Sequence, residues 1–140
     1  EYKEKQALLK KQEMEAAALE AKTIDKVNCG EQQPEVGHLY KGEKSFSGYD
    51  EKFWRSTRGY MFYQLSNKNS EGKFLDISVL DKLKLDNVDI SVNGKPAEII
   101  ATKGKTIRIK LSDVEVINVK IMSNNGEPTP RFYELRILKD

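Results

Sequence analysis

The sequence has few of the residues on which metal and redox chemistry depend. Among its 140 residues there is one cysteine, Cys29, and one histidine, His38. A single cysteine excludes an internal disulfide and does not indicate a compartment. A zinc site needs three or four ligands at fixed geometry, which Glu35 and His38, spaced as E-x-x-H with Glu31 nearby, do not supply. We therefore predict no metal ligands and no cofactor. We expect His38 to be a loop residue that hydrogen-bonds the backbone or a carboxylate, and Cys29 to be a small strand-end residue that is buried or half-exposed.

The sequence also lacks a charge excess of one sign and a long apolar run. Its 24 basic and 22 acidic residues leave a formal net charge of +2. This balance gives no electrostatic case for nucleic acid or a membrane surface as partner. No apolar stretch reaches the roughly 18–20 residues that span a bilayer. Residues 1–22 are charged throughout and lack the apolar segment of a signal peptide. Because the chain begins without Met, we expect it to be a fragment of a longer protein.

No catalytic constellation is visible. The carboxylates of the polar region 31–51 could supply the pair that glycoside hydrolysis needs, held about 5–9 Å apart, but acidic residues in polar loops are usually solvated. Gly42, Gly48 and Gly59 do not form a phosphate-binding loop, because none of them follows a strand and opens a helix. Nor is there a dense oxygen-ligand loop for calcium. Of the functions considered, a hydrolase in its own right is the least favoured.

Residues 1–22 predict a helix. The segment has no Gly, Pro or β-branched residue and is dominated by Ala, Leu, Glu, Lys and Gln, which are strong helix formers. Its apolar stripe is thin and lacks the sustained heptads of a coiled coil; it comprises Ala7, Met14, Ala18 and Ala21. We interpret the segment as a linker helix that enters the domain from a preceding one and docks lightly on it. A dimerising helix is the less favoured alternative.

Residues 23–140 predict a single β-rich domain. Alternating apolar and polar residues indicate eight short strands at 23–27, 59–65, 73–80, 88–92, 96–101, 106–111, 114–122 and 131–138. The region 29–48 is rich in Gly, Glu and Gln and is predicted to be mostly loop, with a turn within 50–56. Asn93-Gly94 is a strong hairpin signal. Short strands at this spacing, without β-α-β alternation, favour an all-β sandwich.

Most aromatic residues gather between residues 30 and 65, including the only tryptophan, Trp54. Flat rings stack on sugar faces while charged and amide groups bind the hydroxyls. Trp54 beside Arg55, with Tyr40, Tyr49 and Tyr60 close in sequence, supplies both kinds of group. The alternative, which we favour, is that these residues form sandwich core and inter-domain packing, since Trp and Arg also mark protein interfaces. The candidate carbohydrate-binding or inter-domain residues are Glu35, His38, Tyr40, Tyr49, Trp54 and Arg55.

Several of these residues lie in a recognisable pattern. The run T-I-D-K-V at 23–27, the run G-E-Q-Q-P-E at 30–35 and His38 resemble the opening of a C-terminal domain of large bacterial glycoside hydrolases of the β-L-arabinofuranosidase type. Further similarity comes at 42–45, Gly48, Trp54-Arg55, the end of the 59–65 strand, 90–94 and 132–138. The resemblance covers residues 23–138. The segment 80–87 departs from the pattern, which usually has a Tyr- and Gly-containing turn there.

The resemblance implies a jelly-roll-like β-sandwich, similar to galactose-binding domains, attached behind a catalytic α/α-barrel. In such enzymes the catalytic glutamate and the cysteine–metal chemistry belong to the barrel, which this chain lacks, so no activity is carried over. We expect a non-catalytic accessory domain of a periplasmic or extracellular glycoside hydrolase that acts on arabinose-containing or related plant glycans, with the barrel as its partner. The alternative is an autonomous carbohydrate-binding module using Trp54 and neighbouring tyrosines, with an oligosaccharide as ligand.

Three roles follow for residues of the matched motif. Arg55 suits a bidentate carboxylate partner, and Glu31 or Glu35 could provide it. Gly30 and Gly48 are expected to supply turn conformations that are closed to other residues. Trp54 is expected to fill space between the sheets or against a neighbouring domain.

Overall fold

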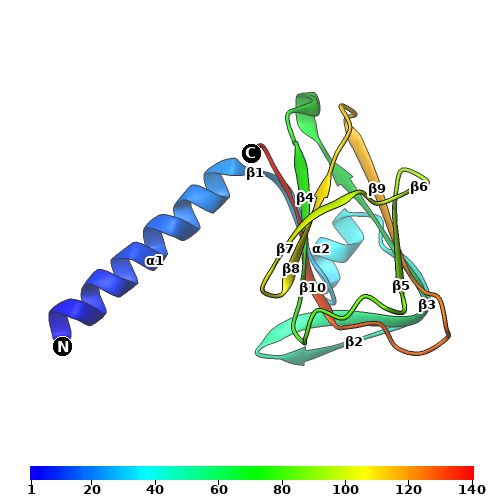
Figure 1. The fold of residues 1–140 in the computed structure, drawn as a ribbon, viewed down its shortest axis with the longest axis horizontal. Helices are drawn as coiled ribbons and strands as arrows, with labels where there is room; N and C mark the ends of the chain where they lie inside the picture. Colours follow the sequence, from blue (N-terminus) through cyan, green and yellow to red (C-terminus); the bar gives the residue numbers. More distant parts are fainter.

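The computed structural model describes residues 1–140, and it places one long helix to one side of two layers of strands (Figure 1). The helical elements are α1 (Tyr2–Lys22), α2 (Gln32–Gly37) and the short 3-10 turn η1 (Lys68–Ser70). The strands are β1 (Thr23–Asn28), β2 (Lys41–Asp50), β3 (Lys52–Ser66), β4 (Phe74–Val79), β5 (Val88–Val92), β6 (Lys95–Pro96), β7 (Ile99–Lys103), β8 (Thr106–Lys110), β9 (Val116–Ser123) and β10 (Phe132–Leu138).

All strand pairs are antiparallel, and together they form one continuous sheet that curls on itself. One layer runs in the order β1-β10-β4-β8-β7 and the other in the order β2-β3-β9-β5-β6. The layers join where Phe132, at the start of β10, pairs with Arg55 of β3. The prediction of an all-β, jelly-roll-like sandwich behind one helix is confirmed.

The core lies between the two layers and is built from alternating residues of the central strands. On β3 the residues Met61, Tyr63 and Leu65 are buried, as the alternation in 59–65 predicts. Strand β4 contributes Leu75 and Ile77 from the opposite layer. Seventeen buried residues form one contiguous cluster. Since apolar burial supplies the main driving force of folding, this cluster fixes how the two layers pack.

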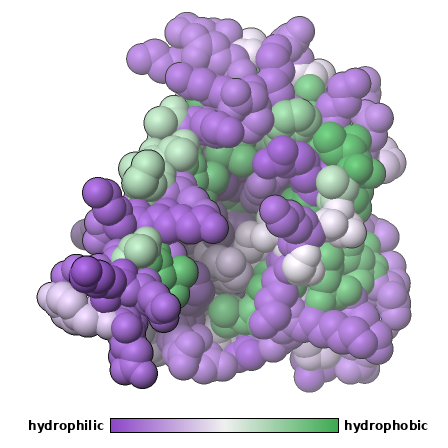
Figure 2. Space-filling view, turned by 60° about the vertical axis from the view of Figure 1, so that its left-hand side comes forward, coloured by the Kyte–Doolittle hydropathy of each residue, from purple (hydrophilic) through white to green (hydrophobic).

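Helix α1 projects away from the sandwich (Figure 1), and none of its residues is buried. It runs into β1 without a loop, and its last turn is tied to the domain. Arg136 of β10 donates hydrogen bonds to Glu20 (3.0 Å) and Thr23 (2.7 Å), and the Thr23 hydroxyl donates to the Leu19 carbonyl (2.7 Å). The predicted helix is confirmed. Figure 2 shows the face of the molecule on the side from which α1 projects, and this face is hollowed near its centre.

The prediction that residues 29–48 are mostly loop is wrong. This region contains α2 and nearly all of β2, which forms a long hairpin with β3 that turns at Asp50–Lys52. The predicted turn at 50–56 is therefore confined to its first residues. Strand β2 pairs with one neighbour only, and most of its side chains are exposed. A strand that is solvated on both faces shows no apolar alternation, and period-2 patterning therefore missed it.

The strand predicted at 96–101 is in fact two elements. Strand β6 makes the short hairpin with β5 that Asn93-Gly94 predicts, and Asn93 and Gly94 both have positive φ. Strand β7 instead leaves that layer and pairs with β8 in the other one. The connection between them crosses from one layer to the other, so the region is two edge strands rather than one.

Candidate functional site

Glu35 and Arg55 form the most extensive side-chain contact of the motif region. Helix α2 carries Glu35, and β3 carries Arg55. The guanidinium binds the carboxylate in a bidentate manner, with Nε 2.6 Å from Oε2 and Nη2 2.8 Å from Oε1. Glu35 is only 5% exposed. The predicted bidentate partner of Arg55 is thus confirmed and is Glu35, whereas Glu31 bonds the Asn28 amide at 3.1 Å.

Further donors surround the same carboxylate. The Gly30 amide donates to Oε2 of Glu35 at 2.9 Å, and the Tyr63 hydroxyl donates to it at 2.5 Å. Burial by itself raises the pKa of Glu35, but the hydrogen bonds from Arg55, Tyr63 and Gly30 outweigh it and hold the pKa below its usual range. Glu35 is therefore an ionised group inside the domain, compensated by three donors.

The neighbours of this carboxylate titrate outside the physiological range. Burial, Cys29 and the Glu35 carboxylate raise the pKa of Tyr63 far above its usual value, so its hydroxyl keeps its proton. Burial also raises the pKa of the Cys29 thiol to about 12. Cys29 is fully buried at the end of β1, as predicted. A buried thiol with a raised pKa is an inert packing residue rather than a nucleophile.

Arg55 makes two further contacts that complete its surroundings. Its guanidinium lies 4.2 Å from the ring centroid of Tyr40, and Nη1 donates to the Ser45 hydroxyl at 3.2 Å. Tyr40 and Ser45 also hydrogen-bond each other. The ring of Tyr40 packs on Tyr63, with centroids 5.4 Å apart. Arg55 therefore ties β2, α2 and the core together, and we name the group Gly30, Glu35, Tyr40, Ser45, Arg55 and Tyr63 the Glu35 brace.

His38 follows α2 and lies apart from Arg55. Its Nδ1 is 2.6 Å from the Pro34 carbonyl oxygen, and its Nε2 is 2.8 Å from Oδ1 of Asp25. The other carboxylate oxygen of Asp25 accepts the Ser66 amide of β3 at 2.8 Å. The predicted backbone-and-carboxylate role of His38 is confirmed. The histidine thus fastens the end of α2 to β1 and β3.

Trp54 is half-buried on the opposite side of the β2–β3 hairpin from Tyr49. Gly48 pairs with Trp54 and Tyr49 pairs with Phe53, and neighbouring positions of a strand point to opposite faces. The Trp54 ring packs edge-on against Phe46, with centroids 6.0 Å apart, and the Arg131 guanidinium lies 5.3 Å above it. The structure therefore does not join Trp54 and the tyrosines into one aromatic patch.

Of Gly30 and Gly48, only Gly30 has a backbone conformation that favours glycine. Gly30 has φ +82°, and a Cβ there would collide with the Trp54 carbonyl. Gly48 lies in β2 rather than in a turn. A Cβ on Gly48 would come within 2.5 Å of the Trp54 ring, so this position admits no side chain because the ring occupies the space. The turn role expected for Gly48 is wrong.

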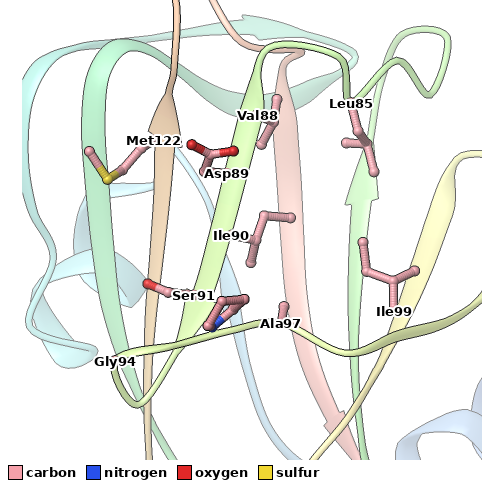
Figure 3. A pocket seen from close by; sticks show the side chains of 10 residues that line it. Leu85, Val88, Asp89, Ile90, Ser91, Gly94, Ala97, Ile99 and Met122 are labelled. Carbon is pink, nitrogen blue, oxygen red and sulfur yellow. The ribbon is translucent and has the colours of Figure 1, made fainter.

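Two hollows were not predicted from the sequence. A small pocket of about 240 Å³ lies at the tip of the β2–β3 hairpin and is lined by polar and aromatic side chains, among them Tyr49, Phe53 and Tyr133. A larger apolar groove of about 550 Å³ opens beside β5 (Figure 3). It is lined by Leu85, Val88, Ile90 and Ile99 among others, with Leu85 contributed by the 80–87 connection that departs from the family pattern. The small pocket joins three segments that are far apart in sequence, and the groove joins residues 85–99 to Met122 of β9.

One family model matches nearly the whole chain, including all the site residues described above. Residues 18–138 match the model of DUF6805, a family of unknown function. The chain belongs to this family. The DUF6805 match begins within α1 and includes the Glu35 brace, Trp54 and both hollows. A search of curated proteins finds no match. No group of three or more His, Cys, Asp or Glu side chains is placed to hold a metal ion, and no helix combines the length and apolar character needed to cross a membrane.

Proposed function

We propose that this DUF6805 chain is a non-catalytic accessory domain of a multidomain glycoside hydrolase that acts on arabinose-containing or related plant glycans. Its role is to pack against the catalytic α/α-barrel of the same polypeptide, in the periplasm or outside the cell. The substrate class, the barrel and the location rest on the resemblance of residues 23–138. The single observation that carries the packing role is the unpartnered helix α1.

The apolar residues of α1 have no contact surface within the chain. Leu8, Leu9 and Met14 are 56%, 58% and 66% exposed, and no residue of the helix is buried. Most helices in proteins draw their stability from packing against other elements. The base of α1 is nevertheless fixed by Arg136. A helix that is anchored at one end and exposed along its length is suited to contact a neighbouring domain.

The internal use of the motif residues supports the same role. Within the Glu35 brace, Arg55 and Tyr63 both donate hydrogen bonds to the Glu35 carboxylate. No buried side-chain nitrogen or oxygen of the chain lacks a hydrogen-bond partner. A ligand site would instead leave polar groups directed into a cavity. These residues stabilise the fold and so hold its outer surface in a fixed shape.

The packing role can be tested with a triple variant of α1, Leu8→Gln, Leu9→Gln and Met14→Gln. In the 140-residue chain the free energy of unfolding should change by less than about 0.5 kcal/mol, because the three side chains are exposed. In a longer polypeptide that includes the barrel, the same changes should lower the melting temperature. The matched control is Lys10→Gln with Glu13→Gln, on the same helix. An unchanged melting temperature in the longer polypeptide would refute the packing role.

The alternative is an autonomous carbohydrate-binding module, which the exposed ring of Tyr49, 67% accessible, favours. Trp54 is the only tryptophan, so its fluorescence reports on one place beside the hairpin tip. The proposed accessory role predicts a flat response when the chain is titrated with arabinose- and galactose-containing oligosaccharides. A saturable shift that is lost in Tyr49→Ala would support the binding module instead.

A further inference from the structure

The pocket at the tip of the β2–β3 hairpin combines aromatic rings with carboxylates. Its walls include Tyr49 and Phe53 from the hairpin and Tyr133 from β10, together with Glu31 and Glu51. Tyr49 and Phe53 pack edge-on with centroids 4.9 Å apart, and both are exposed to solvent. The pocket is open, and no residue of α1 lines it.

The tip is held in place from its other face. Arg131 bonds Asp81 through two nitrogens, at 2.9 and 2.6 Å, and reaches Asp50 at 3.2 Å. The same guanidinium lies over Trp54. These contacts link the hairpin turn to the connection after β4. Because the tip is fixed before any partner arrives, little conformational entropy is lost when its rings are covered.

The lining of the pocket stabilises positive charge. The Lys52 ammonium lies 4.5 Å from the ring centroid of Tyr133, so one cation of the chain already occupies an aromatic face. Lys52 is the only basic residue in the lining, which includes three carboxylates. Glu134 is bound by Arg136 through both oxygens, at 2.8 and 3.2 Å. Glu31 receives only the Asn28 amide, and the Glu51 carboxylate makes no hydrogen bond or ion pair.

We propose that this pocket receives an arginine side chain from the domain against which the accessory domain packs. A planar guanidinium can stack on the rings of Tyr49 or Phe53 while it pairs with the Glu51 carboxylate, a combination that an ammonium matches less well. The proposal rests on the packing role given above. Because domains of one polypeptide meet at millimolar effective concentration, a weak arginine site is sufficient to set their orientation.

The test titrates the ¹⁵N-labelled 140-residue chain with N-acetyl-arginine amide. The neutral isostere N-acetyl-citrulline amide serves as the matched ligand. Saturable shifts of the amide resonances of Glu51, Lys52 and Phe53 are expected with the arginine compound and not with citrulline. Equal responses to the two compounds, or no saturation with either, would overturn the proposal. A lysine analogue that binds more tightly than arginine would also overturn it.

Variants separate this site from a sugar site. Glu51→Gln should weaken arginine binding about two- to fivefold. Lys52→Gln should strengthen it by a similar factor, because the resident ammonium no longer competes for the Tyr133 ring. Phe46→Ala, on the opposite face of the hairpin, should leave it unchanged. Weaker binding by Lys52→Gln would contradict a cation site.

The two proposals can fail separately. Failure of the arginine titration, with the sugar titration flat and the α1 variant still destabilising the longer polypeptide, overturns the pocket alone. Saturable sugar shifts at the same amides, without arginine binding, overturn both proposals.

Discussion

Arg55 contacts Glu35 of α2, Ser45 of β2 and the ring of Tyr40. Its guanidinium neutralises Glu35, whose side chain is 6% exposed. Removing one partner of a buried ion pair leaves the other charge uncompensated, so Arg55→Ala should cost on the order of 3 kcal/mol of unfolding free energy. Urea denaturation followed by Trp54 emission measures this. The control Arg58→Ala, at an exposed site 3.8 Å from Glu127, should change stability by less than about 0.5 kcal/mol. A loss of under 1 kcal/mol for Arg55→Ala would contradict the account.

The same carboxylate predicts how stability depends on pH. The pKa of Glu35 is lowered in the folded state, so its stabilising contribution is complete above its unfolded pKa of about 4.3. This contribution is lost as pH falls toward and through the lower pKa of the folded state, because over that range the unfolded chain binds more protons than the folded chain. Glu35→Gln should therefore be about 2 kcal/mol less stable at pH 7, and this difference should shrink below pH 4. Denaturant titrations of both proteins from pH 7 to pH 3 would show it, and a gap that stays constant with pH would exclude Glu35 as its source.

For individual residues, the sequence predicted pairwise contacts better than it predicted the full membership of the Glu35 brace. The carboxylate partner of Arg55 and the hydrogen bonds of His38 could be predicted from residue chemistry. A guanidinium suits a bidentate carboxylate, and a single histidine without further metal ligands is expected to hydrogen-bond the backbone or a carboxylate. Tyr63 and the Gly30 amide were not predicted as members of the Glu35 brace. They come from β3 and from the loop before α2, and only the folded chain brings those segments to one carboxylate.

Among the elements, the β2–β3 hairpin depends on the fit between Gly48 and the Trp54 ring. An added methyl group at Gly48 would lie within 2.5 Å of that ring. Gly48→Ala should therefore displace Trp54, cost about 1–3 kcal/mol and change the tryptophan emission. Gly37→Ala is the matched control, since a Cβ there meets nothing within 4 Å. If Gly48→Ala retained both the stability and the spectrum of the parent, close packing against Trp54 would be refuted.

The elements also show where sequence patterning is informative. Strands that border the core, such as β8 and β9, alternate clearly because one of their faces is buried. Strand β2 was missed because its residues are solvated on both sides, and β7 was joined to β6 because both are short edge strands. The pockets at the hairpin tip and beside β5 lie between such edges. They could not be predicted because they depend on which layer each edge strand joins.

At the scale of the whole molecule, a cooperative sandwich carries an appended helix. One cluster of 17 buried residues spans both layers, whereas α1 contributes no buried residue. Most of the stability of helices in proteins comes from tertiary packing of an apolar face, which α1 does not have within this chain. The two parts of the chain should therefore open independently, with α1 at low free energy and the sandwich only on global unfolding.

Hydrogen exchange and thiol labelling together test this division. Amides in the first half of α1 should exchange fastest, those near the Arg136 anchor more slowly, and those of β3 and β10 only with global unfolding. Cys29 reports the same event from inside the core, because burial raises the pKa of its thiol to about 12 and no solvent reaches it. Its labelling by a thiol reagent in native buffer should thus match the exchange rate of the slowest β3 amides when opening limits both. If the amides of α1 were protected from exchange as strongly as those of β3, the helix would be packed in solution. A dimer of two chains joined through α1 would produce this result. Size-exclusion chromatography with light scattering would then give a mass of two chains instead of one.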